Sequence, residues 1–316
     1  MSDQARSGLH RVLLDRRFAV TAELETRDSA DPAAVYRLAD ALRDRVDAVN
    51  CTDNSSAHPH IAPIAAARLL IDRGVEPILQ LACRDRNRLA LQADILGAAA
   101  LGVRNIVCMT GDDVTAGDHP EAKPIFDLDA LHLLRIARIM RDRGTYVSGR
   151  ALEDAPNVLV GAVENPFAPP HDYRPMRLGK KLEAGAEFVQ TQICFNVERM
   201  RLFMARSAEL GLLDRLWVLG GVFVPRSARA VRYLRDQVPG IDVPEEVLRR
   251  MQGVPEERQR EEGTRMALEI VGQLRTMPGL AGIHLMSIRN HEAILQVIDE
   301  AGLRRGTGRI EPVPAG

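Results

Sequence analysis

The sequence predicts an α/β protein that folds as one (β/α)8 barrel, the TIM-barrel class. Eight apolar, strand-like segments alternate with helical segments at nearly regular spacing along the 316 residues, which is the pattern of βαβ units and a parallel sheet. Several strand segments are apolar throughout, as expected when both faces of a parallel sheet are buried. Eight such units in a chain of this length match the size of a barrel of this class.

The predicted strands are short apolar segments, and six of the eight end in a hydrogen-bonding side chain. The clearest example, residues 105–109, is an apolar segment that stops abruptly at Thr110-Gly111-Asp112, as a buried strand does where it opens into a loop. The predicted strands span residues 18–23, 46–51, 76–83, 105–109, 158–163, 187–192, 216–222 and 282–286.

The segments between the strands carry apolar residues at helical spacing, and several have recognisable ends. The first helix starts at Asp31-Pro32, with the proline just inside the helix start. Gly74, Gly102 and Gly185 stand where three helices stop, and glycine is typical of the residue just past a helix end. The predicted helices span residues 31–42, 61–73, 87–101, 127–143, 173–184, 197–210, several segments between 227 and 274, and 291–301.

The chain shows no linker or change of composition that would divide it into two domains. A doubly wound open sheet is the alternative fold, but nothing like the GxGxxG motif follows the first strand, as a dinucleotide-binding sheet of that kind requires. We therefore predict a single catalytic barrel over residues 1–303 and a loose C-terminal tail over 304–316. The charged stretch 255–263 is predicted to be a solvated helix start.

Composition and charge exclude several classes of function. A net charge of −1 and 4% aromatic residues predict no nucleic-acid binding. The longest apolar runs, such as 61–70, are interrupted and too short to span a membrane. The N-terminus lacks an apolar signal core, so we expect a cytoplasmic protein. Four cysteines are spread singly without a CxxC pair, which favours reduced core residues over a disulfide framework or metal cluster.

Polar side chains at the strand ends are the candidates for function. In a barrel of this class, chemistry takes place at the carboxyl ends of the strands, so these side chains would share one pocket. Glu23, partly desolvated there, is a candidate general acid, whereas amides can recognise a heterocycle edge. Asp112 has a second interpretation as a helix-capping or turn carboxylate. The candidates are Glu23, Thr52-Asp53-Asn54, Gln80, Thr110-Gly111-Asp112, Glu164-Asn165 and Gln192.

No spacing of His, Asp and Glu predicts a metal centre among these residues. His58 and His60, which flank Pro59 in a predicted loop, are the one conceivable metal pair. No Ser/His/Asp or Cys/His arrangement for nucleophilic catalysis can be picked out. A carboxylate with several amides and no metal fits an organic cofactor or a heterocyclic substrate better than acyl or phosphoryl transfer.

The order of motifs along residues 18–303 resembles the methylenetetrahydrofolate reductase family, most closely its bacterial branch from acetogenic and one-carbon-metabolising organisms. The motifs occur in the same order and at similar spacing over nearly the whole chain. They are Ala22-Glu23, Ala48 to Asn54, Arg84-Asp-Arg-Asn-Arg88, Thr110-Gly-Asp112, Gly117 to Lys123, Glu164-Asn-Pro-Phe167, Lys180 to Gly185, and Gln190-Thr-Gln192 with Phe195.

The resemblance implies an FAD-containing barrel that interconverts 5,10-methylene- and 5-methyl-tetrahydrofolate in one-carbon metabolism and methionine biosynthesis. It makes Glu23 the general acid that helps to open the methylene bridge to a 5-iminium cation, which then receives hydride from flavin N5. Asp112 would lie beside flavin and pterin, and Gln192 would contact folate and nicotinamide. The positions implied for FAD binding are Thr52, Gln80, Thr110, Gly111, Asp112, Phe126, Asn165 and Lys181.

Lys181 at this position would be a partner for the pyrophosphate, with a solvated helix lysine beside Lys180 as the alternative. The sequence also departs from the family. Gln80 stands where well-known members have His, and Thr110 stands where they have Arg. Met286 to Asn290 replaces an expected aromatic residue and Arg, with Arg289 as a shifted partner for the glutamate tail of folate.

These departures leave alternatives open. In one, the protein is flavin-free and NADH passes hydride directly to folate. In another, the chain is a flavin-carrying subunit that receives electrons from a partner protein. A third, a barrel that binds a folate-like ligand without catalysis, is disfavoured because Glu23 and Asp112 match catalytic positions. The choice between NADH and NADPH and the physiological direction, including oxidation of methyl-tetrahydrofolate from a demethylase, stay open, and the family suggests a homo-oligomer.

Overall fold

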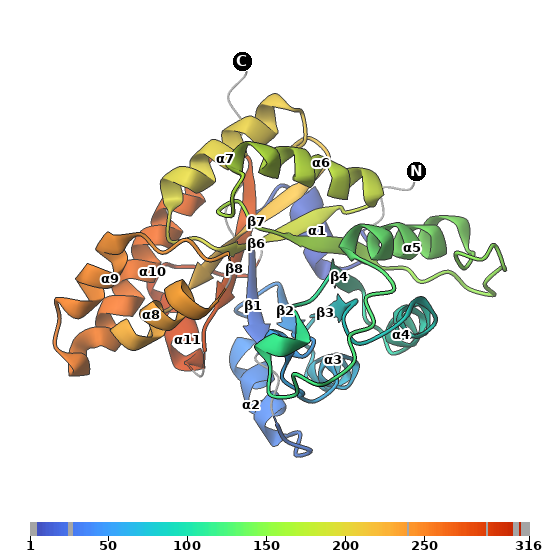
Figure 1. Cartoon of the computed structure of the whole chain (residues 1–316), viewed down its shortest axis with the longest axis horizontal. Helices are drawn as coiled ribbons and strands as arrows, with labels where there is room; N and C mark the ends of the chain where they lie inside the picture. Colours follow the sequence, from blue (N-terminus) through green and yellow to red (C-terminus); the bar gives the residue numbers. More distant parts are fainter. Residues whose placement is uncertain (1–4, 25–27, 239, 289, 306–309, 311–316) are drawn as a thin grey trace.

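The protein is a closed barrel of eight parallel strands with helices outside it (Figure 1). The computed structural model describes all residues except 1–4, 25–27, 239, 289, 306–309 and 311–316. The predicted (β/α)8 fold is confirmed, because the strands pair in sequence order and β8 pairs with β1 to close the barrel. The strands are β1 (Ala19–Leu24), β2 (Ala48–Cys51), β3 (Pro77–Ala82), β4 (Asn105–Met109), β5 (Leu159–Glu164), β6 (Phe188–Ile193), β7 (Trp217–Phe223) and β8 (Leu280–Met286).

The helices agree with the predicted ranges to within a few residues at each end. In the described residues, the helical stretch predicted after β7 forms three α-helices. The residues between α5 and β5 form a loop with an antiparallel bridge between Thr145 and Ala151. The helices are α1 (Gly8–Leu14), α2 (Ala33–Leu42), α3 (Pro63–Asp72), α4 (Arg88–Ala100), α5 (Ala130–Arg143), α6 (Arg174–Ala184), α7 (Val197–Glu209), α8 (Ala228–Gln237), α9 (Glu245–Gln252), α10 (Gln259–Arg275) and α11 (His291–Glu300).

Helix α1 was not predicted, and it closes the amino-terminal end of the barrel. Leu9 and Leu13 are fully buried against the residues that fill the barrel interior. Glu76, just before β3, accepts hydrogen bonds from the backbone N–H groups of Gly8 at 2.7 Å and Leu9 at 2.9 Å. A seven-residue helix is too short for a periodic pattern to identify it, so its position depends on these tertiary contacts.

Side chains fill the barrel in layers. Along each strand, alternate side chains point inward. The lowest layer is apolar and includes Ala19 of β1, Phe188 of β6 and Leu219 of β7. Gly161 of β5 makes room for Phe188, because a Cβ at that position would lie 2.4 Å from the phenyl ring. Above this apolar layer the interior becomes polar toward the carboxyl ends of the strands.

The outer core, between barrel and helices, holds the four cysteines. Cys51, Cys83, Cys108 and Cys194 are free and buried, as predicted. Burial raises the pKa of Cys83 to about 12 and that of Cys194 to about 12, so these thiols stay protonated and unreactive near neutral pH. Within the described residues, no helix has both the length and the apolar character to cross a membrane.

The stretch 255–263 is largely the solvated helix start that was predicted, because residues 255–258, 260 and 261 are exposed. Helix α10 begins within it, but Glu262 is buried and forms ion pairs with Arg250 at 2.5 Å and with Arg265. Of the predicted tail, residues 304, 305 and 310 are described, and the backbone N–H of Ile310 donates to the carbonyl oxygen of Arg16 at 3.0 Å. The boundary at residue 303 stays a prediction.

Candidate active site

Glu23 lies near the carboxyl end of β1, at the mouth of the barrel. Its side chain is 25% exposed, and Glu23 Oε2 lies 3.7 Å from Nε2 of His284, whose ring is buried. The closing pair of strands causes this approach, since Thr21 of β1 is the register partner of His284 of β8, and Glu23 follows Thr21 by two residues on the same face. The predicted acid therefore has a histidine partner that the sequence did not indicate.

A network of buried polar side chains lies in the barrel beneath Glu23. Asn50 Nδ2 donates to Gln190 Oε1 at 2.7 Å, and Gln190 Nε2 donates to Asn50 Oδ1 at 3.0 Å. Nδ1 of His284 lies 3.0 Å from Thr21 Oγ1 and 3.3 Å from Gln190 Nε2. The network joins four strands across the barrel, and it satisfies groups that would be costly to bury alone.

Gln192 lies at an irregularity of strand pairing. The register between β6 and β7 shifts between Gln190 and Ile193, and such bulges turn a side chain next to a site. Gly221 of β7 permits the close approach, because a Cβ there would lie 2.5 Å from the carbonyl oxygen of Thr191 and 2.7 Å from that of Gln192. Gln192 Oε1 accepts a hydrogen bond from the N–H of Ile193 at 2.9 Å, which orients the amide.

Gln80 and Thr52 are both buried near the ends of neighbouring strands. Gln80 lies on β3, on the inward face that also carries Ile78 of the interior cluster. Thr52 follows β2 directly, and its hydroxyl donates to the carbonyl oxygen of Leu24 at 3.4 Å. Thr52 thus connects the end of β2 to the end of β1, next to Glu23.

The loop after β4 has the shape that Gly111 permits. Gly111 has φ +92°, and a Cβ would lie 3.1 Å from Cβ of Arg84 and 3.3 Å from Cβ of Ala82. Asp112 follows on the exposed side of the loop. Thr110 Oγ1 accepts a hydrogen bond from the N–H of Ala130 at 3.2 Å, so the threonine ties this loop to the first residue of α5.

Arg84 joins the loops after β2, β3 and β4, although its side chain is only 2% exposed. Its guanidinium donates to both carboxylate oxygens of Asp85 at 2.8 and 2.9 Å, to the carbonyl oxygen of Asn54 at 3.0 Å and to that of Asp112 at 3.4 Å. Partial burial works against ionisation of Asp85, but the hydrogen bonds from Arg84 and Asn54 hold its pKa below the usual range. The position of Asp112 therefore depends on Arg84.

Asp53 anchors a loop. Its carboxylate accepts a hydrogen bond from the N–H of Ala82 at 2.7 Å and pairs with Arg86, which also pairs with Asp94 at 2.8 Å. Burial raises the pKa of Asp53, and the ion pair with Arg86 only partly opposes this effect. The contacts of Asp53 therefore attach the loop after β2 to the end of β3.

Lys181 and Glu164 form a buried ion pair, with Lys181 Nζ 2.6 Å from Glu164 Oε2. The ammonium also donates to the carbonyl oxygen of Val163 at 2.5 Å, and the side chains are 4% and 1% exposed. Burial lowers the pKa of Lys181, and the charge of Glu164 opposes that shift. The alternative of a solvated helix lysine is thereby excluded.

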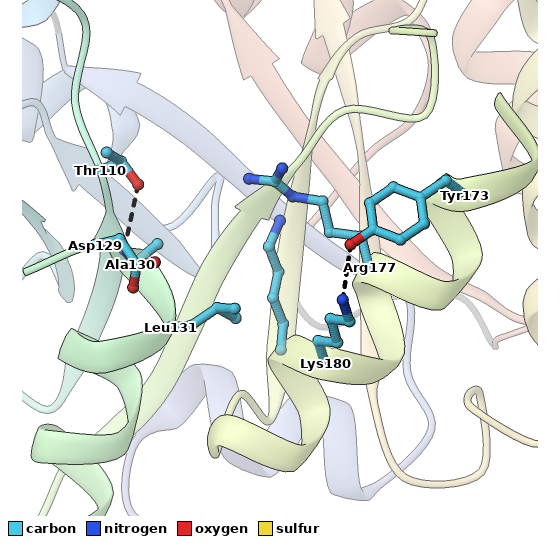
Figure 2. Close-up of a pocket in the computed structure, with 8 residues that line it drawn as sticks. Thr110, Asp129, Ala130, Leu131, Tyr173, Arg177 and Lys180 are labelled. Atoms are coloured by element: carbon cyan, nitrogen blue, oxygen red, sulfur yellow. Dashed lines mark hydrogen bonds between the residues drawn. The ribbon is translucent and has the colours of Figure 1, made fainter. Parts of the chain in front are cut away.

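A cleft of about 140 Å³ lies beside this ion pair, between α6 and the start of α5. Thr110 and the first residues of α5 line one side, and Tyr173, Arg177 and Lys180 line the other (Figure 2). Lys180 Nζ donates to the hydroxyl of Tyr173 at 2.8 Å, and this contact lowers the pKa of Tyr173.

The chemistry of the cleft suits an anion. Arg177, Lys180 and Lys181 bring three basic side chains to one wall, and the first residues of α5 line the other. Guanidinium and ammonium groups are the usual partners of phosphate. Asp129 at the rim is the one acidic lining residue, and its Oδ1 accepts a hydrogen bond from the N–H of His132 at 2.9 Å. The residues present therefore fit the diphosphate of a dinucleotide cofactor.

Two other predicted cofactor residues lie in loops near the mouth. Phe126 has φ +37° and is 37% exposed, so a part of its ring is accessible. Asn165 uses both ends of its amide inside the protein, because Nδ2 donates to the carbonyl oxygen of Gly240 at 2.7 Å and Oδ1 accepts from the N–H of Phe167 at 3.0 Å. Arg289, predicted to bind the folate tail, lies outside the described residues.

The two loop histidines have other partners. His58 Nδ1 lies 2.9 Å from the carbonyl oxygen of Ser56, and His60 Nδ1 lies 2.5 Å from Asp28 Oδ1. In the part of the chain that the structure describes, no three His, Cys, Asp or Glu side chains gather as metal ligands do.

The sequence contained a signal for the network that was missed. Thr21, Asn50 and Gln190 each precede a predicted strand-end residue by two positions, at Glu23, Thr52 and Gln192. Two polar residues at a spacing of two lie on the same face of a strand. His284, a polar residue inside an otherwise apolar strand, lacks this signal because Met286 stands two positions after it. Arg84 begins the motif Arg84-Asp-Arg-Asn-Arg88 noted in the sequence, but the motif did not indicate that this arginine would connect three loops.

Comparisons with known proteins agree with the resemblance seen in the sequence. A family model described as methylenetetrahydrofolate reductase matches residues 32–302, a span that begins after β1 and Glu23. A probable methylenetetrahydrofolate reductase (NADPH) of Caenorhabditis elegans is 22% identical over 245 residues, which make up 75% of this chain and 34% of that protein. The chain thus spans about a third of the length of this curated relative.

Solved structures share the fold at low sequence identity. An uncharacterized protein from Clostridium thermocellum that binds two copies of 5-methyl-5,6,7,8-tetrahydrofolic acid has a TM-score of 0.67 and 14% identity, covering 93% of this chain and 98% of that one. DmoA from Hyphomicrobium sulfonivorans has a TM-score of 0.59 and 9% identity, covering 94% and 91%. Because the family model covers all but the first strand of the barrel, the chain belongs to the methylenetetrahydrofolate reductase family.

Proposed function

We propose that the protein is a flavin-dependent oxidoreductase that interconverts 5,10-methylenetetrahydrofolate and 5-methyltetrahydrofolate, with FAD as cofactor and NADH or NADPH as electron partner. The observation that carries the proposal is the position of Glu23. It is the carboxylate on β1 at the mouth of a barrel whose family acts on this substrate, and its side chain is partly exposed beside a buried imidazole.

Glu23 would donate the proton that opens the methylene bridge of the substrate. Proton donation by a positioned carboxylic acid contributes roughly 10²–10⁴-fold to a rate. Glu23 suits this role because its Oε2 faces the buried ring of His284 at 3.7 Å, while the exposed part of the side chain can reach a ligand at the barrel mouth.

Gln192 and Asp112 would bind the pterin. An amide presents a donor and an acceptor together, which suits the edge of a heterocycle, and Gln192 is already oriented by the N–H of Ile193. Asp112 is exposed, and its backbone is held by Arg84. A carboxylate accepts hydrogen bonds from the N–H groups of an aminopyrimidine ring, so Asp112 would orient the pterin relative to Glu23.

The basic cleft supports the choice of a dinucleotide cofactor. Arg177 and Lys180 would hold the diphosphate, and Lys181, which is paired with Glu164, would line the base of the cleft. Thr52, Gln80, Thr110, Gly111, Phe126 and Asn165 complete the proposed FAD-binding set. When bound, a flavin supplies two-electron hydride chemistry that side chains lack. Assembly as a homo-oligomer is part of the proposal.

The test combines an absorption spectrum with one substitution and its control. We expect flavin bands in the purified protein, oxidation of NADH or NADPH with methylene-tetrahydrofolate, and loss of folate turnover by about 10²-fold or more in Glu23→Gln. Glu209→Gln, an exposed position on α7, should turn over folate like the unmodified protein.

Other results would redirect or reject the proposal. A colourless protein that oxidises NADH with the folate substrate would establish direct hydride transfer without flavin. Flavin reduction only by an added partner protein would make the chain a subunit of a larger electron-transfer system. Unaltered folate turnover in Glu23→Gln would remove the assigned acid.

A further inference from the structure

The buried network beneath Glu23 determines which hydrogen-bonding partners the ring of His284 has. We infer that His284 is the positioning residue of Glu23, held by Gln190 in the tautomer that carries its proton on Nε2, so that this N–H faces the Glu23 carboxylate. The inference rests on the proposed function, because it takes Glu23 as the acid of that reaction.

The tautomer follows from the partners of the other ring nitrogen. Nδ1 of His284 lies 3.3 Å from Gln190 Nε2, and an amide nitrogen is a donor only. The hydroxyl of Thr21, at 3.0 Å from Nδ1, can donate to Nδ1 or to the carbonyl oxygen of Ile283 at 3.2 Å. We take Gln190 as the donor to Nδ1, which leaves the proton on Nε2. Asn50 fixes the orientation of Gln190, because the two amides exchange hydrogen bonds at 2.7 and 3.0 Å.

The carboxylate supports the same assignment from the other side of the ring. If both amides of the Asn50–Gln190 pair were turned over, an oxygen would face Nδ1 and the proton would move to that nitrogen. While Glu23 is ionised, Nε2 would then present a lone pair to Glu23 Oε2 at 3.7 Å, and two acceptors would face each other. The Nε2–H tautomer avoids this repulsion.

The arrangement holds one carboxyl oxygen and leaves the other for proton transfer. A separation of 3.7 Å between Nε2 and Oε2 is longer than a hydrogen bond, but catalytic hydrogen bonds are often long without substrate and tighten when it binds. His284 is buried and linked to four strands by its network, so its ring is a rigid reference point. The ring therefore gives the partly exposed side chain of Glu23 a preferred orientation.

Two amide substitutions at position 284 separate the roles of the two ring nitrogens. The side-chain nitrogen of His284→Gln reaches the position of Nε2 and can donate to Glu23, whereas His284→Asn is shorter and reaches only the position of Nδ1. Both remove the titratable ring. We expect His284→Gln to keep folate turnover within about 3-fold, and His284→Asn to lower kcat by about 10-fold or more with little change in KM, since misplacement of an acid costs part of its contribution.

Turnover of NADH with an artificial dye, measured on the same samples, separates loss of flavin from loss of the folate step. Equal folate activity in the two variants, whether both are impaired or both intact, would overturn the positioning role. A larger loss in His284→Gln than in His284→Asn would overturn it as well.

The tautomer itself is tested by nitrogen NMR on the unmodified full chain labelled with ¹⁵N-histidine. We expect a protonated Nε2 and an unprotonated Nδ1 for His284, a shift of the Nε2 signal in Glu23→Gln, and the same tautomer in Thr21→Val, where Gln190 still donates. A proton on Nδ1 would refute the inference. This measurement needs no turnover, so a protein inactive toward folate would refute the proposed function while the tautomer is still decided.

Discussion

Lys181 Nζ and Glu164 Oε2 lie 2.6 Å apart in a region almost closed to solvent, at the base of a cleft lined by two further basic side chains. The carbonyl oxygen of Val163 accepts a second hydrogen bond from the same ammonium. The pair links α6 to the end of β5. A buried charge of this kind is stable only while its partner remains.

Removing one member of this pair should destabilise the protein strongly. In Lys181→Met, the carboxylate of Glu164 stays buried without its cation, and we expect a loss of about 3–5 kcal/mol in the free energy of unfolding. The double variant Lys181→Met/Glu164→Gln buries no charge. Its loss in free energy of unfolding should therefore be smaller than the sum of the losses of the two single variants. Urea unfolding measures all three, and strictly additive losses would contradict the coupling.

The guanidinium of Arg84 should hold the loops at the barrel mouth in place through its several hydrogen bonds. Lysine at this position keeps the charge but cannot reach Asp85, Asn54 and Asp112 together. We expect Arg84→Lys to raise KM for folate by about 10-fold with a smaller change in kcat, because Asp112 loses its fixed backbone position. Steady-state kinetics provide the measurement. The exposed pair Arg206–Glu209 offers the control Arg206→Lys, which should leave KM unchanged.

Substitution of Gly111 by alanine should lower the free energy of unfolding more than the same substitution at Gly144, a second glycine with positive φ. Gly144 has φ +62° and open space around the site of a Cβ, so Gly144→Ala measures only the backbone cost of about 1 kcal/mol. At Gly111 the Cβ also presses on Arg84 and Ala82, at 3.1 and 3.3 Å, and we expect a loss of about 2 kcal/mol or more. Denaturant midpoints compare the two variants, and a larger cost at Gly144 would speak against the contact.

Asp127 should stabilise the fold in a pH-dependent way. Hydrogen bonds from the side chain and backbone of Arg88 lower the pKa of Asp127 to about 2, below its unfolded value of about 3.9. The folded state therefore favours the carboxylate, and the stabilisation is complete above the unfolded pKa and disappears as pH falls through about 2. The difference in urea midpoint between the unmodified protein and Asp127→Asn should shrink over this window. Arg88→Gln should behave likewise, and an unchanged difference at pH 2 would rule the effect out.

The alternation of strands and helices was readable from the sequence because it depends on local rules. Apolar segments of strand length, glycines at helix ends and the spacing of the units predicted the barrel. They also placed Glu23, Gln80, Thr110 and Gln192 at strand ends, since the carboxyl ends of parallel strands meet on one face. Alternation along β1, β2 and β6 would further have indicated Thr21, Asn50 and Gln190.

Only the tertiary structure decided which of these side chains meet. Glu23 and His284 stand at opposite ends of the sequence and approach each other because β8 pairs with β1 when the barrel closes. Lys181 became the buried partner of Glu164 because α6 packs against β5, although the sequence equally allowed a solvated lysine. Local patterns report which residues are polar and where a strand ends, whereas pairing and burial depend on the closure of the whole sheet.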